Sequence, residues 1–221
     1  MMPDAFAATL YHDGNAAAVP VSEWFDAIRQ IGVAAVVFDC DGTLAESSEA
    51  HFRSMQLAAA QQGREMSRDW YAARTGLDRS ALFEEFASLV GDDFDRHRAA
   101  LDSIAAFPRN TGLIKPIPET VALFDRLHAA GYPLAVGTNA ERGIAQVSLN
   151  RAGVLSRLSV LVSISDGVRP KPSPDIFQLA AERLSVAHDR TLVIEDSPQG
   201  LSAAIAAGMP ALKVTRLDYA D

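Results

Sequence analysis

Four apolar runs, each followed by a segment with helical spacing, constrain the fold of this chain more than any other feature of its sequence. The runs are apolar at odd and even positions alike, as in parallel strands that helices cover on both faces. They span residues 33–38, 132–138, 158–164 and 191–196, and a shorter run at 210–214 ends the series. Strands that alternate with helices predict an α/β fold built on a doubly wound parallel sheet.

The segments between these runs carry the apolar period and the end signals of helices. We predict helices over residues 118–131, 141–153, 173–185 and 197–209. Most begin at Pro, Ser or an acidic residue, and three end at a glycine, which accepts the left-handed conformation common at helix C-termini. These glycines are Gly131, Gly153 and Gly208.

Residues 45–115 interrupt the alternation, because each periodic segment in them is helical and none reads as a strand. A helical block inserted after the first strand is most simply a separate cap. We therefore expect a core made of residues 1–44 and 116–221, with residues 45–115 as an α-helical cap domain. Its linkers, at 44–47 and 115–118, would lie side by side and form a hinge.

The first 32 residues form an extension that precedes the predicted sheet. Residues 1–20 look loosely ordered, and SEWFDAIRQ then predicts a short helix with Ser22 as its N-cap. The extension has neither the basic start of a signal peptide nor the long apolar core of a membrane anchor, so we expect a cytoplasmic protein. The apolar residues on one side of the short helix are Trp24, Phe25 and Ile28.

The composition restricts the partners of the chain. A formal net charge of −8 argues against nucleic acid and against an anionic membrane surface, so an anionic substrate must be captured locally. The single cysteine, Cys40, excludes an intramolecular disulfide and fits a reducing compartment. We interpret it as a small buried spacer. A monomer and a homodimer are both compatible with the sequence.

The first apolar run leads directly into two carboxylates one residue apart, Asp39 and Asp41, followed by a turn at Gly42. Burying like charges this close is costly, because the apolar strand before them supplies neither solvent nor a partner. A cationic group is therefore expected nearby.

Other polar residues end two of the later runs. Thr138 and Asn139 follow the second run, and Glu195 and Asp196 follow a later one. Since ligands of open parallel sheets bind outside the carboxyl ends of the strands, these residues should share one rim with Asp39. Oxygen ligands without a Cys or His cluster suit a hard divalent cation, and Mg²⁺ is the natural candidate.

Lys171 is one of only three lysines in the chain and lies between prolines that stiffen its loop. Together with a metal ion it could hold a phosphate group against an otherwise acidic wall. Asp39 could then attack phosphorus directly, because a carboxylate is ionised at neutral pH. Asp41 could protonate the leaving oxygen and later deprotonate the attacking water.

Four short motifs resemble those of the haloacid dehalogenase superfamily, in the same order. They are DCDGTL at 39–44, GTN at 137–139, KPSPD at 171–175 and EDSPQG at 195–200. The resemblance covers residues 33–214 and includes a helical insertion at the position of that superfamily's first type of cap. It implies a Mg²⁺-dependent phosphotransfer enzyme with a Rossmann-like core.

The resemblance also assigns roles to the motif residues. It implies that Asp39 is the nucleophile and Asp41 the general acid and base, whose backbone carbonyl also binds the metal. Asp196 matches the main acidic metal ligand and Glu195 a supporting one, while Lys171 matches the lysine that neutralises charge. Thr138 matches the catalytic hydroxyl of the second motif. The residues that match neighbours of the substrate phosphate are Asn139, Gly42 and Thr43.

Differences between this chain and individual branches of the superfamily reduce the number of reactions that it could catalyse. The dehalogenase branch lacks a second aspartate like Asp41, and phosphonate hydrolases use a cap lysine, which residues 45–114 do not contain. The cap also resembles that of β-phosphoglucomutases, which implies substrate contacts by His51 and Arg79, although both could equally be ordinary helix residues. That mutase cap has a lysine where this chain has Thr75.

A branch that dephosphorylates sugar bisphosphates usually has Glu where this chain has Ser48. We therefore expect a phosphatase that acts on a small phosphomonoester, such as a sugar or polyol phosphate. A sugar phosphomutase is the alternative within the superfamily. A binding module that has lost turnover is the alternative outside enzymes, and the intact charged residues of the motifs argue against it.

Overall fold

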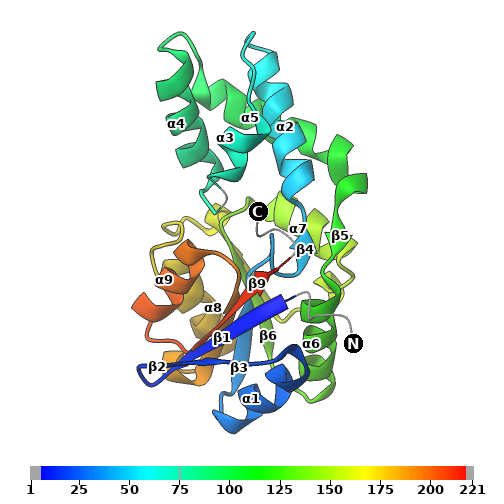
Figure 1. Ribbon diagram of the computed structural model, residues 1–221, viewed down its shortest axis with the longest axis vertical. Coiled ribbons are helices and arrows are strands. Elements are labelled where there is room, and N and C mark those ends of the chain that lie inside the picture. The colour runs from blue at the N-terminus through cyan, green and yellow to red at the C-terminus, as the bar shows by residue number, and fades with distance from the viewer. Residues whose placement is uncertain (1–5, 75, 218–221) are drawn as a thin grey trace.

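The computed structural model describes residues 6–74 and 76–217. A seven-stranded sheet forms the core, in the order β2-β1-β9-β8-β3-β6-β7, and a block of helices stands at one end of it (Figure 1). The strands of this sheet are β1 (Phe6–His12), β2 (Asn15–Ala18), β3 (Ala35–Phe38), β6 (Leu134–Thr138), β7 (Val160–Ser163), β8 (Thr191–Glu195) and β9 (Ala211–Arg216). The predicted parallel sheet is confirmed for five of them, since β3, β6, β7, β8 and β9 pair in parallel.

Helices cover both faces of the sheet, as a doubly wound fold requires. Val36 and Phe38 of β3 belong to the core cluster on one face, while Val37 between them belongs to the cluster on the other. This alternation explains why the strand is apolar at each position. The first face is covered by α1 (Trp24–Gln30), α6 (Pro118–Ala129) and α7 (Arg142–Arg151), and the second by α8 (Asp175–Leu184) and α9 (Pro198–Ala206). Single turns of 3-10 helix lie at η1 (Val21–Glu23), η3 (Leu155–Arg157), η4 (Ile164–Asp166) and η5 (His188–Arg190).

The expectation of loose order over residues 1–20 is wrong for the part that the structure describes. Strands β1 and β2 form an antiparallel hairpin, and β1 continues the sheet by pairing with β9 from Phe6 opposite Arg216 to Tyr11 opposite Ala211. Phe6 is buried and packs edge to face on Trp24. Ser22 is also not the N-cap that we expected, because it lies inside η1 and the helix begins at Trp24.

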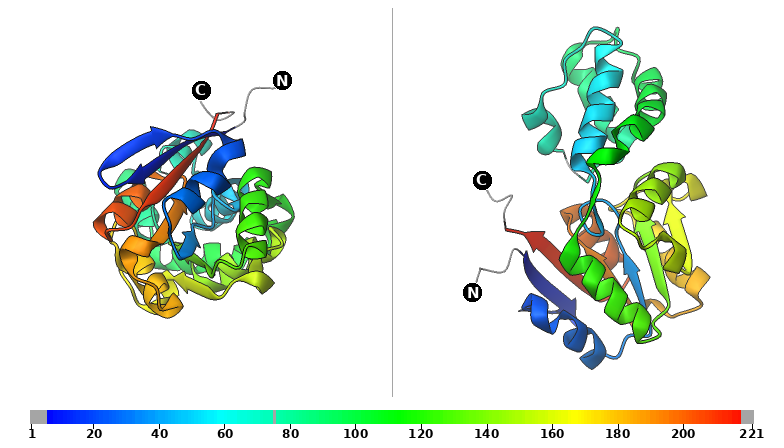
Figure 2. Two further views of the ribbon diagram at one scale, coloured as in Figure 1. Left: turned by 90° about the horizontal axis from the view of Figure 1, so that it is seen from below. Right: turned by 90° about the vertical axis from the view of Figure 1, so that its right-hand side faces the viewer.

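The inserted block consists of α2 (Ser48–Ala60), α3 (Arg68–Ala72), α4 (Arg79–Val90), α5 (Arg96–Ala106) and the 3-10 helix η2 (Phe107–Leu113). Helices α2 to α5 enclose a hydrophobic cluster of their own, centred on the buried rings of Phe83 and Phe86. Hereafter we call residues 47–114 the cap. In the right-hand view of Figure 2 it stands clear of the sheet.

Two short linkers join the cap to the core, and they lie side by side as expected. The prediction of no strand over 45–115 is wrong at both ends, because β4 (Ala45–Glu46) pairs antiparallel with β5 (Lys115–Pro116). A ladder of two residues is too short to produce a period in the sequence.

Among the described residues, no helix combines the length and the apolar character needed to cross a bilayer.

Candidate active site

Strand β3 delivers Asp39 to the carboxyl edge of the sheet. Phe38 lies opposite Ile194 of β8, and the backbone N–H of Asp39 donates to the Ile194 carbonyl oxygen at 2.8 Å. Because these strands are parallel and in this register, Asp39, which follows β3, and Glu195, the last residue of β8, reach the same rim. Asp39 and Glu195 are therefore neighbours in space, although 156 positions separate their numbers along the chain.

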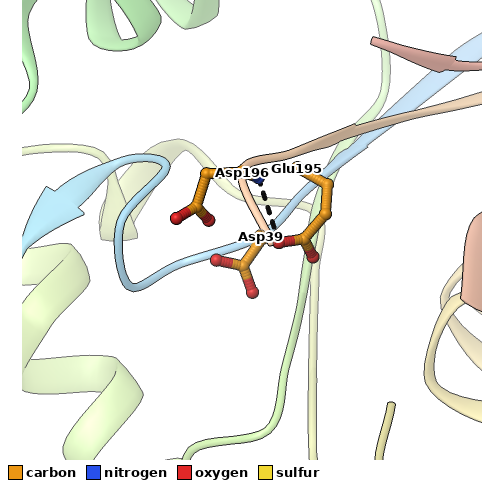
Figure 3. Close-up of side chains that lie close together, drawn as sticks. All are labelled: Asp39, Glu195 and Asp196. Atoms are coloured by element: carbon orange, nitrogen blue, oxygen red, sulfur yellow. Dashed lines mark hydrogen bonds between the residues drawn. The ribbon is translucent and has the colours of Figure 1, made fainter. Parts of the chain in front are cut away.

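Three carboxylates converge at this rim. One oxygen atom from each of Asp39, Glu195 and Asp196 lies within 4.8 Å of the others, and Figure 3 shows the three side chains grouped at the strand ends. The dashed line in Figure 3 is the hydrogen bond from the Asp196 backbone N–H to Glu195 Oε1, 3.0 Å long. A donor set made only of carboxylate oxygens fits a hard cation such as Mg²⁺.

Lys171 partly neutralises this group. Its Nζ donates to Asp39 Oδ1 at 2.6 Å and to Glu195 Oε2 at 2.7 Å, and only 6% of the residue is exposed. Burial alone would lower the pKa of the ammonium, but the charges on Asp39 and Glu195 outweigh it and raise that pKa above its usual value. Lys171 is therefore a fixed positive charge beside Asp39.

One ammonium against three carboxylates leaves the group short of positive charge. Burial, followed by repulsion from Glu195, raises the pKa of Asp39 to about 7. The same two causes raise the pKa of Asp196 well above its usual value, whereas Lys171 overcomes burial and keeps the pKa of Glu195 low. A divalent cation at the three oxygens would supply the missing charge.

The carboxylate of Asp41 stands apart from the three and has partners of its own. It accepts a hydrogen bond of 2.5 Å from the Ser47 hydroxyl, and His51 Nε2 lies 3.4 Å from its Oδ1. Burial would raise the pKa of Asp41, but His51 and the Ser47 hydroxyl outweigh it and lower that pKa. The two aspartates of the first motif thus have pKa values shifted in opposite directions.

Gly42 and Thr43, which we predicted as substrate contacts, both meet the side chain of Asp196. A Cβ at Gly42 would lie 2.3 Å from Asp196 Oδ2, and Gly42 has a φ of +91° that favours glycine. The hydroxyl of the fully buried Thr43 donates to Asp196 Oδ1 at 3.0 Å. The turn after β3 therefore positions a predicted metal ligand.

Thr138 and Asn139 lie at the end of β6, on the same rim. The Thr138 hydroxyl is buried and accepts the backbone N–H of Ala140 at 3.1 Å. Asn139 Oδ1 accepts the backbone N–H of Lys171 at 2.8 Å, and its Nδ2 donates to the Lys171 carbonyl at 3.3 Å and to that of Gly76 at 3.4 Å. Asn139 thus fixes the lysine loop and contacts the cap.

The two predicted cap contacts occupy different environments. His51 is buried between Asp41 and the ring of Phe107, whose centroid lies 4.7 Å from that of the imidazole. Arg79 is also buried and forms an ion pair with Glu141 of the core at 2.9 Å. Thr75, the third cap position that we singled out, lies outside the described residues.

A family model for haloacid dehalogenase-like hydrolases matches residues 33–208, which include the whole rim described above. The chain belongs to this family. Two curated relatives from Escherichia coli are each 30% identical to it: the fructose-1-phosphate phosphatase YqaB, over 83% of this chain and 97% of the relative, and hexitol phosphatase A, over 80% and 81%. A crystal structure of CbbY from Rhodobacter sphaeroides in complex with phosphate superposes with a TM-score of 0.72 at 26% identity, over 81% of this chain and 84% of that one.

In this haloacid dehalogenase-like hydrolase, two residues that the sequence did not single out set the place of the Glu195 side chain, one by hydrogen bonds and one by leaving room for it. Ser197 donates its backbone N–H and its hydroxyl to Glu195 Oε1, both at 2.9 Å. A Cβ at Gly200 would lie only 1.9 Å from Glu195 Oε2. Both residues fall inside the fourth motif, so the signal was present, but a Ser-Pro start and a glycine also begin many ordinary helices.

Proposed function

We propose that this hydrolase is a Mg²⁺-dependent phosphatase that acts on a small phosphomonoester of a sugar or polyol. The proposal depends on one observation: Asp39 lies buried at a strand end, in contact with Lys171, two residues before a second carboxylate with different partners. The relatives named as phosphatases of fructose 1-phosphate and of hexitols support this substrate class. A small phosphorylated metabolite as partner and a cytoplasmic location belong to the same proposal.

The three clustered carboxylates, together with the backbone carbonyl of Asp41, would hold Mg²⁺, which supplies positive charge to them and to the phosphoryl oxygens. Asp39 attacks phosphorus, and the bond from phosphorus to the ester oxygen breaks, which leaves an aspartyl phosphate. Lys171 stabilises the negative charge that develops on the phosphoryl group. The leaving oxygen takes a proton from Asp41.

The second half of the reaction reverses the role of Asp41. It accepts a proton from water, the water oxygen attacks phosphorus, and the bond between phosphorus and Asp39 breaks to release inorganic phosphate. The lowered pKa of Asp41 suits this base role, because its carboxylate is ionised at neutral pH. In the first half it must be protonated before the ester bond breaks.

The test is phosphate release from a panel of sugar, polyol and nucleoside phosphates, with Mg²⁺ and with a chelator. We expect release that depends on Mg²⁺ and that Asp39→Asn reduces by at least about a thousandfold, as for loss of a nucleophile. Asp26→Asn, an exposed aspartate of α1, is the matched control and should retain full activity. Conversion of a sugar phosphate into its isomer without release would favour the mutase, and no turnover at all would favour the binding module.

A further inference from the structure

An ion pair joins the cap to the core two residues beyond Asn139 of the rim. Arg79, the first residue of α4, donates its Nε to Glu141 Oε1 at 2.9 Å and its Nη2 to Oε2 at 3.3 Å. The third nitrogen, Nη1, donates to the hydroxyl of Ser103 in α5 at 2.8 Å. Each of the three guanidinium nitrogens therefore has a hydrogen-bond partner, and only 5% of Arg79 is exposed.

This pair belongs to a contact between one cap loop, residues 76–79, and the rim. The Gly76 carbonyl accepts a hydrogen bond from Asn139, and a Cβ at Gly76 would lie 2.7 Å from Gln199 Oε1. Glu141 follows Asn139 by two residues, and Asn139 holds the Lys171 loop. Asn139 therefore links this loop to Lys171, so a substrate whose phosphate binds at Lys171 would have the loop as its neighbour on the cap side.

A buried guanidinium in that position is a natural ligand for a second phosphate, because its planar donors match phosphate oxygens. Here the core supplies Glu141, whose carboxylate occupies two of those donors and cancels the charge. A second phosphate would have to displace Glu141 from Arg79 and would then lie beside a carboxylate. Such a juxtaposition of like charges disfavours binding strongly.

We propose that the Arg79–Glu141 pair makes the distal part of the site electrically neutral, so that the enzyme accepts sugar or polyol monophosphates and rejects bisphosphates. Glu141 is then a specificity-determining residue, and Arg79 contacts Glu141 instead of a substrate phosphate. This inference rests on the proposed phosphatase function. It further specifies that the end of the substrate away from the reacting phosphate carries no second phosphate.

The experiment compares kcat/KM for the best sugar monophosphate of the panel with that for the bisphosphate of the same sugar, beginning with fructose 1-phosphate and fructose 1,6-bisphosphate. The parent should prefer the monophosphate by about tenfold or more, and Glu141→Gln should raise the ratio of bisphosphate to monophosphate efficiency by about tenfold. The double variant Glu141→Gln with Arg79→Gln restores neutrality and should return the ratio to that of the parent. The ratio is independent of a general loss of turnover.

The matched control is Glu84→Gln. It removes a carboxylate of α4, the helix that begins at Arg79, and this carboxylate pairs with Arg96 on the cap surface. The control should leave the ratio unchanged. Glu141 is the N-cap residue of α7. If Glu141→Gln does not fold, Glu141→Ser takes its place, because serine is favoured at helix N-caps. Equal efficiency of the parent on both substrates, or an unchanged ratio in both Glu141 variants, would overturn the inference. A parent that releases phosphate from no monophosphate would instead overturn the proposed function, and this inference with it.

Discussion

At the scale of single residues, the site depends on one lysine that contacts two carboxylates. Sequence reasoning located Lys171 and the carboxylates, because parallel strands that end together bring the residues after them to one rim. It did not pair Arg79 with Glu141, since the two lie 62 positions apart and the acidic residue also reads as an ordinary helix start. Contacts that depend on how the cap meets the core leave no local pattern.

Replacing Lys171 by Met should destabilise the fold, because Asp39 and Glu195 would then lie buried without a cationic partner. We expect a loss of about 3–5 kcal/mol in the free energy of unfolding, measured by urea denaturation in the presence of a chelator. The chain offers a matched control in Lys115→Met, since Lys115 is exposed on β5. A loss of similar size in both variants would contradict the importance of the buried contacts.

Gly200→Ala should also destabilise the fold, because the added methyl group would collide with Glu195, which Ser197 and Lys171 hold in place. Overpacking of this kind costs about 1–3 kcal/mol, and phosphatase activity should fall with it. Gly143→Ala is the control, because nothing lies within 4 Å of a Cβ there and the residue is helical. That control should gain about 0.5–1 kcal/mol in thermal or urea unfolding. Equal stability of the two variants would show that Glu195 can move.

At the scale of elements, the sequence predicted the buried strands well and the peripheral ones poorly. A strand such as β3, buried on both faces, is apolar at each position and stands out from its surroundings. Strand β2 consists of an asparagine and three alanines, all exposed, so neither an alternation nor β-branched residues mark it. The hairpin of β1 and β2 forms because β9 offers an edge and because Phe6 can pack on Trp24.

The N-terminal extension should therefore contribute to the stability of the core. Trp24 is almost completely buried, and its indole N–H donates to the Val19 carbonyl at 3.1 Å. We expect Trp24→Ala to cost about 3–5 kcal/mol in urea unfolding, as for other buried aromatic residues. Phe25→Ala, at the neighbouring and only half-buried ring, should cost clearly less. Equal losses of unfolding free energy in the two variants would mean that the half-buried ring of Phe25 contributes as much to the packing of α1 as Trp24 does.

At the scale of the whole molecule, the cap contacts the core through the loop of Gly76 and Arg79 and through η2, whose Phe107 shares the core cluster with α7, and it is tethered by the two linkers. Arg79→Gln removes the ion pair but leaves the linkers and the contact of η2 with α7 intact, so the α4 side of the cap should separate from the rim more often. We expect a larger radius of gyration in solution scattering of the substrate-free protein. Arg96→Gln, which breaks an ion pair within the cap, should leave the radius unchanged. An unchanged radius in both variants would mean that other contacts hold the cap.

The pairing of β4 with β5 has a consequence for engineering and for evolution. Ala45 lies opposite Pro116, so the chain leaves the core and returns to it at adjacent points, although the cap occupies the intervening sequence. An insertion whose two ends meet can be exchanged for another of different length or shape without altering the path of the sheet. The cap is in this sense an exchangeable unit, and we expect a graft of another family member's cap between positions 46 and 115 to change the substrate preference while Asp39, Glu195 and Asp196 keep their places, provided that the graft keeps counterparts of Ser47 and His51 beside Asp41.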